Sequence, residues 1–137
     1  MKIEDQVCSL ELAKKLKELG VIQESYFIHA GNRGVIPRFD TDIIRKTSLW
    51  DDVEKLIFAA FSVAELLDIF PDHTEPHRWH FGMERKELRE QCGGKYYCVT
   101  DARDYPHDDD FYSDNPADCL ANAIIMLIES KFIEAQK

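Results

Sequence analysis

The chain carries the stretch Ser113-Asp114-Asn115-Pro116-Ala117-Asp118, followed by an apolar run from Cys119 to Ile133. Asn115 is a favourable helix N-cap, and Pro116 suits the first helical turn because that turn needs no amide hydrogen from it. The run beyond them is apolar on nearly every side, so a helix formed there must lie against other parts of the protein. This stretch therefore predicts a helix at the centre of a compact fold.

The length and charge of the chain limit what the protein can be. A chain of 137 residues falls within the usual size of one domain, and we expect residues 1–137 to form one α+β domain. Its 17 lysines and arginines and 26 aspartates and glutamates give a formal charge of −9 at pH 7. Such a charge disfavours direct binding to nucleic acid and favours a protein partner with a basic surface.

The cysteines and the apolar segments indicate a cytoplasmic protein. Cys8, Cys92, Cys98 and Cys119 include no closely spaced pair, and the first residues lack the apolar core of a signal peptide. No unbroken apolar run is longer than Ala123 to Ile128, which is far shorter than the roughly 20 residues that a membrane span needs. We therefore expect reduced thiols and no association with a membrane.

The N-terminal part of the chain predicts a helix. Ser9 is a candidate N-cap, and Gly20 is a candidate end because it can adopt the left-handed conformation that helix ends often need. Val21 can then fold back on the last turn in a Schellman closure. One face of this helix is apolar and carries Leu12, Leu16 and Leu19.

Extended segments follow. Residues 25–30 and 35–39 predict two strands joined by a turn, and Pro37 favours an edge position for the second. The apolar run 57–61 fits either a buried strand or the end of a helix.

The middle of the chain predicts a further helix and a pair of strands. Ser62 and Glu65 form a capping box at the start of a helix that ends at Pro71. Residues 78–84 alternate between apolar and polar, as in a strand with one buried face, and 95–100 follow a pair of glycines as the returning strand. Together these elements predict an α+β fold in which three to four helices pack on a small, mostly antiparallel sheet.

Residues 101–114 predict a solvated acidic loop. Its six aspartates surround His107, but three of them are consecutive and no glycine interrupts them, unlike the cation cage of an EF-hand, so we predict no metal site. Aromatic side chains interleave with these acids, a mixture that suits docking on a basic surface. The predicted partner-binding residues are Tyr105, Asp108, Asp109, Asp110, Phe111 and Tyr112.

A rival interpretation is a metal-dependent nuclease or hydrolase that uses Asp72, Glu84 and Lys86. In such enzymes two carboxylates hold a divalent ion and a lysine assists the attacking water. On a strand, Glu84 and Lys86 would point the same way. Three common residue types at loose spacing recur by chance, so we expect no catalytic residue and no cofactor.

Three smaller features each have two interpretations. His77 and His80 would face opposite sides of a strand and so could not bind one ion together without a bend. Cys92 and Cys98 could meet across a hairpin, although a reducing compartment favours free thiols. Ile125 lies in the polar stripe of the last helix, where either a neighbouring loop covers it or it forms a homodimer interface through this helix.

Three segments of the chain resemble small uncharacterised proteins encoded by bacterial prophages and mobile elements. These segments are VCSLELAKKLKELG (7–20), AFSVAELL (60–67) and NPADCLA (115–121). The group supplies no known catalytic residues. The resemblance implies a small acidic protein that binds a host protein, such as an inhibitor of restriction or CRISPR machinery. We therefore expect a non-catalytic, phage-related inhibitor of a host defence system that acts by protein binding.

Overall fold

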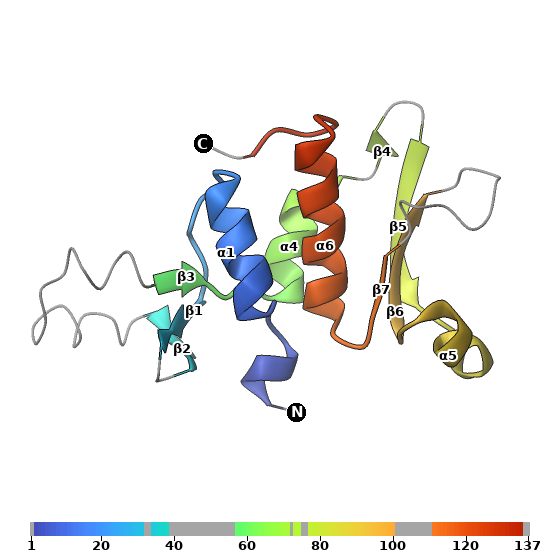
Figure 1. Ribbon diagram of the computed structural model, residues 1–137, viewed down its shortest axis with the longest axis horizontal. Coiled ribbons are helices and arrows are strands. Elements are labelled where there is room, and N and C mark those ends of the chain that lie inside the picture. The colour runs from blue at the N-terminus through green and yellow to red at the C-terminus, as the bar shows by residue number, and fades with distance from the viewer. Residues whose placement is uncertain are drawn as a thin grey trace, which may run out of the picture.

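A computed structural model describes residues 2–31, 34–38, 57–71, 73–74, 77–100 and 111–135. The helices, labelled as in Figure 1, are α1 (Leu10–Glu18), α4 (Val63–Ile69), α5 (Arg89–Cys92) and α6 (Pro116–Glu129), with short 3₁₀ turns η1 (Ile3–Asp5) and η4 (Lys86–Leu88). The strands are β1 (Phe27–Ala30), β2 (Val35–Pro37), β3 (Ile57–Ala59), β4 (His73–Thr74), β5 (His77–Met83), β6 (Tyr96–Thr100) and β7 (Phe111–Ser113).

The predicted α+β class is confirmed, but the expectation of one sheet is wrong. The described strands form two antiparallel sheets, with orders β2-β1-β3 and β4-β5-β6-β7. Figure 1 shows these sheets on opposite sides of the packed helices α1, α4 and α6. Sequence patterns pair strands that are neighbours along the chain, and they do not say which pairs share a sheet.

Helix α6 is the central element, as its sequence predicts. It contacts α1 and α4 as well as β6 and β7, so neighbours cover it on several sides. Its start is capped as expected, because Oδ1 of Asn115 accepts hydrogen bonds from the amides of Ala117 (2.8 Å) and Asp118 (3.2 Å). Ile125 is 9 % exposed, so it is buried in the chain, in agreement with the interpretation in which neighbouring residues cover it.

Helix α1 ends in the predicted Schellman closure. Gly20 has φ +90°, its amide donates to the carbonyl of Lys17, and the amide of Val21 donates to the carbonyl of Leu16. At the other end of α1, the side chain of Ser9 makes no capping hydrogen bond. The backbone amide of Ser9 donates a hydrogen bond to the side chain of Asp118 in α6.

The strand and capping predictions of the middle segment are also confirmed. Residues 57–59 form a strand rather than a helix end, and β2, which contains Pro37, is an edge strand. Ser62 and Glu65 form the capping box of α4. Strands β5 and β6 pair antiparallel, but the link between them contains η4 and α5, which ends at Gly93 with φ +95°.

The described helices contain no segment with the length and apolarity needed to span a bilayer.

Candidate functional site

The predicted partner-binding loop is only partly described. Tyr105, Asp108, Asp109 and Asp110 lie outside the described residues, as does the candidate cation site around them except for Asp114. Residues 111–113, expected to belong to this loop, form strand β7, which pairs with β6. A three-residue strand in an acidic context has no sequence pattern of its own, because pairing with β6 is what defines it.

The two described members of the predicted site are integrated into the fold. Phe111 is half-buried and packs against the hydrophobic core. Tyr112 is also half-buried, and the centroid of its ring lies 6.3 Å from that of Tyr97 in β6. Both side chains therefore stand on a sheet instead of on a free loop.

The residues proposed for a nuclease do not share one strand. Strand β5 ends at Met83, and Lys86 begins the 3₁₀ turn η4, so the expectation that Glu84 and Lys86 point the same way from a strand is wrong. Oε1 of Glu84 accepts a hydrogen bond from the amide of Arg85 (2.9 Å). Asp72 lies outside the described residues, and among those described no three His, Cys, Asp or Glu side chains gather in a metal-binding group.

His80 is exposed, and the side chains of His77 and Cys92 are not among those that the structure describes.

A cysteine pair forms between elements that the sequence does not link. Cys98 in β6 lies beside Cys119 in α6, with 3.5 Å between the two Sγ atoms, and both are buried as free thiols. The hydrogen bond with Cys119 and burial raise the pKa of the Cys98 thiol far above its ordinary range.

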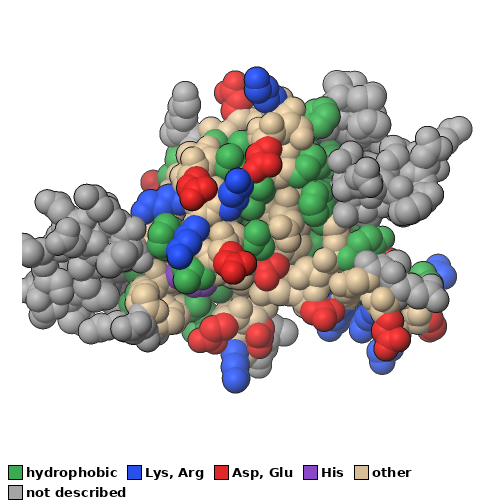
Figure 2. Space-filling view, in the orientation of Figure 1, with side chains coloured by type: hydrophobic (Ala, Val, Ile, Leu, Met, Phe, Trp, Pro, Cys, Tyr) green, Lys and Arg blue, Asp and Glu red, His purple; other side chains and the backbone are tan. Residues whose placement is uncertain are grey.

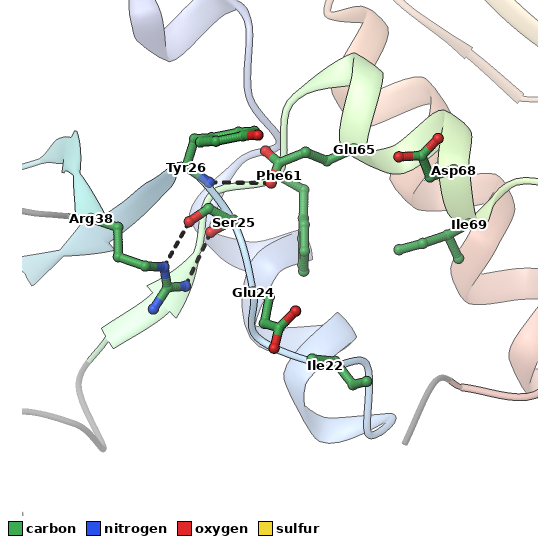
Figure 3. A pocket seen from close by; sticks show the side chains of 9 residues that line it. All are labelled: Ile22, Glu24, Ser25, Tyr26, Arg38, Phe61, Glu65, Asp68 and Ile69. Atoms are coloured by element: carbon green, nitrogen blue, oxygen red, sulfur yellow. Dashed lines mark hydrogen bonds between the residues drawn. The ribbon is translucent and has the colours of Figure 1, made fainter.

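A cleft lies beside α4, and we call it the Tyr26 cleft. Its volume is about 520 Å³, and Figure 3 shows its lining side chains. They come from the segment after α1, from α4, from the link that precedes α4 and from the residue that follows β2. The lining residues are Ile22, Glu24, Ser25, Tyr26, Arg38, Phe61, Glu65, Asp68 and Ile69.

Hydrogen bonds from side chains fix the irregular segment that forms one wall of the cleft. The amide of Tyr26 donates to Oε2 of Glu65 (3.2 Å), while the other oxygen of Glu65 accepts the Ser62 amide (3.1 Å) of the capping box. From the opposite side, Arg38 donates to the carbonyls of Ser25 (2.7 Å) and Gln23, and Figure 3 shows its bonds to the carbonyl and the hydroxyl of Ser25.

Gln23 adds a third anchor to the same wall. Its Oε1 accepts the amide of Ala59 in β3 (3.0 Å), and its Nε2 donates to the carbonyl of Val21 (3.0 Å). Residues 21–26 therefore have defined positions although they form neither helix nor strand.

The cleft joins an apolar floor to an acidic rim. The half-buried Ile22 and Ile69 supply the accessible apolar surface, while Phe61, which also lines the cleft, is only 2 % exposed. The exposed Glu24 and Asp68 stand at the rim, so the lining carries three carboxylates and one guanidinium.

Sequence reasoning missed this site. The sequence predicts Glu65 only as part of the capping box, which occupies one of its two oxygens. It places Tyr26 within a strand, whereas that strand begins at Phe27. The four-residue segment Gln23-Glu24-Ser25-Tyr26, polar and ending in an aromatic residue, was the available signal.

A second cleft, of about 480 Å³, is lined in part by Asp5, Lys95, Tyr96 and Asp114. Its charges are mixed, and the backbone amide of Lys95 donates to Oδ1 of Asp114 (3.0 Å). The Tyr26 cleft is therefore the more strongly acidic of the two.

Comparisons of the chain with protein-family models, with curated proteins and with solved structures find no match.

Proposed function

We propose that this protein is a non-catalytic binding protein whose acidic surface recognises a protein partner with a basic surface. The single observation that carries the proposal is the Tyr26 cleft, in which carboxylates surround an apolar floor beside an exposed aromatic residue. Aromatic anchors next to complementary charge are typical of protein interfaces.

The overall charge supports the same partner. The formal charge of −9 attracts a basic surface over a range of about one Debye length, roughly 10 Å at moderate salt. Figure 2 shows carboxylates scattered over one face of the molecule with basic side chains between them. A dispersed charge of this kind speeds association, whereas individual anchors supply most of the affinity.

The biological context of the proposal is the inhibition of a host defence system, on the resemblance to phage-encoded proteins. A partner that itself binds nucleic acid presents the basic surface that an acidic protein would occupy. The loop with Asp108, Asp109 and Asp110 would add to the same interaction.

Affinity capture with the tagged full chain from the cells that encode it, followed by calorimetry on the purified pair, tests the proposal. We expect the dissociation constant to rise at least about tenfold between about 50 mM and about 300 mM salt, because screening weakens charge attraction. A complex that is insensitive to salt, or the failure of every captured protein to bind in purified form, would overturn the proposal.

The contribution of the acidic loop has its own matched control. The triple variant Asp108→Ala, Asp109→Ala and Asp110→Ala should weaken the complex, whereas Glu11→Gln, Glu87→Gln and Glu90→Gln change the net charge equally at other exposed positions. Equal losses in the two triple variants would remove the loop from the interface while leaving the general attraction in place.

A further inference from the structure

We infer that the Tyr26 cleft is the docking site for a lysine or arginine side chain of the protein partner. The aliphatic stem would lie on Ile22 and Ile69, and the cationic end would lie at the rim with Glu24 and Asp68. This inference rests on the proposed function, since it names the chemistry that the partner presents.

The apolar floor fits the stem of a long basic side chain. Lysine and arginine carry three or four methylene groups that bury readily while the charged end stays near water. Ile22 and Ile69 provide a surface for these groups within a volume of about 520 Å³, inside the range of about 300 to 1,000 Å³ typical of ligand sites. A short polar side chain would leave this floor uncovered.

The charges of the rim select a cation. Glu24 and Asp68 are exposed, and among the described residues no salt bridge involves either of them. The nearest basic group in the lining, Arg38, directs its guanidinium to the carbonyls of Gln23 and Ser25. A bound lysine or arginine would therefore meet carboxylates at the opening of the cleft.

The rigidity of the wall favours binding. Glu65, Arg38 and Gln23 hold the backbone of residues 21–26 through the hydrogen bonds described above. A preformed site loses less conformational entropy on binding than a site that must become ordered. Glu65 acts here as a positioning residue, because its oxygens are engaged with Tyr26 and with Ser62.

Tyr26 supplies an aromatic surface at the mouth of the cleft. Its side chain is 78 % exposed, the largest exposed fraction among the exposed large hydrophobic residues, although its backbone amide is fixed by Glu65. A tyrosine face attracts ammonium and guanidinium groups through cation–π interaction. The exposed ring of Tyr26, on a backbone that Glu65 holds, is therefore available to a cationic occupant.

Titration of the ¹⁵N-labelled full chain with the peptide acetyl-Gly-Lys-Gly-Arg-Gly-amide tests the inference by NMR. We expect the amide shifts to change around Tyr26, Glu65 and Ile69, with a dissociation constant on the order of 1 mM. The neutral peptide that carries acetyl-lysine and citrulline should cause no such change. Shifts spread evenly over other acidic regions, or no shifts at all, would overturn the inference.

Paired variants separate the cleft from general charge. Glu24→Gln with Asp68→Asn should weaken peptide binding at least about fivefold, and Glu87→Gln with Glu90→Gln, which changes the charge equally near α5, should stay within about twofold. All four positions are exposed, so the variants should fold. Tyr26→Ala should weaken binding by about two- to fivefold. Equal effects of the two paired variants would overturn the inference.

The same variants distinguish this inference from the proposed function. If the partner complex depends on salt but is unaffected by Glu24→Gln with Asp68→Asn, the binding function stands and the cleft is not its site. If the peptide binds in the cleft but the full chain has no protein partner, the proposed function is wrong and the cation site stands.

Discussion

The backbone amide of Ser9 donates a 2.6 Å hydrogen bond to Oδ1 of Asp118, across 109 positions of sequence. A second bond runs alongside it, from Nδ2 of Asn115 to the carbonyl of Val7 (3.0 Å). The first turn of α6 therefore binds the residues that lead into α1. Because helix starts leave amides without partners inside the helix, this bond satisfies a group that α1 cannot satisfy itself.

Removal of the Asp118 carboxylate should destabilise the protein. We expect Asp118→Ala to lower the free energy of unfolding by about 1 to 3 kcal/mol, since the Ser9 amide loses a charged acceptor. Asp118→Asn should cost less because its amide oxygen can still accept the bond. Urea unfolding monitored by circular dichroism measures both changes.

An exposed ion pair between α6 and α1 provides the control. Glu129 contacts Lys15 at 3.1 Å, but both side chains are nearly half exposed, at 47 % and 46 %. Glu129→Ala should therefore cost less than about 1 kcal/mol. A larger loss from Glu129→Ala than from Asp118→Ala would contradict the importance given to the Ser9 bond.

The sequence predicted features that depend on residues within a few positions of one another. The caps at Asn115 and Ser62 and the closure at Gly20 are examples, because each is a hydrogen-bond pattern within one helical turn. The Ser9 cap is predicted from the same rule, but its side chain makes no capping bond, and the hydrogen bond from its amide to Asp118 of α6 could not be predicted from local sequence.

Features that join distant segments could not be predicted from the sequence. The Cys98 and Cys119 pair and the Tyr26 cleft each require knowledge of which elements meet. The cleft needs Glu65 to face the segment after α1 and Arg38 to reach back to Gln23. Neither arrangement leaves a periodic pattern in the sequence, because each depends on single side chains.

Gly94 should tolerate no side chain. A Cβ atom at this position would lie 2.5 Å from the backbone nitrogen of Ser113 in β7, and backbone atoms cannot move aside cheaply. We expect Gly94→Ala to lower the free energy of unfolding by about 3 kcal/mol or to displace β7. Thermal unfolding and the near-ultraviolet signal of the tyrosines report these two effects.

Gly82 offers the matched comparison within the same sheet. A Cβ atom there would lie 2.8 Å from Oη of Tyr97, which is the end of a side chain that can rotate. Gly82→Ala should therefore cost less, about 1 kcal/mol. Equal losses at the two glycines would show that the distinction between backbone and side-chain contact is wrong.

The buried thiols should react slowly with Ellman's reagent in the folded protein. Cys8, Cys98 and Cys119 are buried, and a raised pKa keeps the thiols of Cys8 and Cys98 protonated, whereas the thiolate is the reactive form. In a Cys92→Ser background we expect their reaction to be at least about a hundredfold slower than that of an exposed cysteine. Urea should release all of them, and rapid reaction without urea would contradict the burial.

The stability of the protein should fall as the pH rises above 9. Burial raises the pKa of the Cys8 thiol from its ordinary value of 9.0 to about 12, so the folded state favours the protonated thiol. The unfolded chain releases this proton first, and unfolding therefore becomes easier as the pH climbs from 9 toward 12. Below pH 9 the thiol is protonated in both states and contributes no slope.

The size of this effect is bounded by linkage, and Cys8→Ala isolates it. One thiol can lower the free energy of unfolding by at most about 1.4 kcal/mol for each pH unit. Urea unfolding at pH 8, 9 and 10 should show that the free energy of unfolding declines less steeply for Cys8→Ala than for the native chain. The two chains carry the same lysines and tyrosines, so the difference between them reports on Cys8. Parallel declines would mean that the Cys8 thiol ionises as easily in the folded protein as in the unfolded chain. The complete burial of Cys8, whose amide donates to the carbonyl of Phe61, predicts the opposite result.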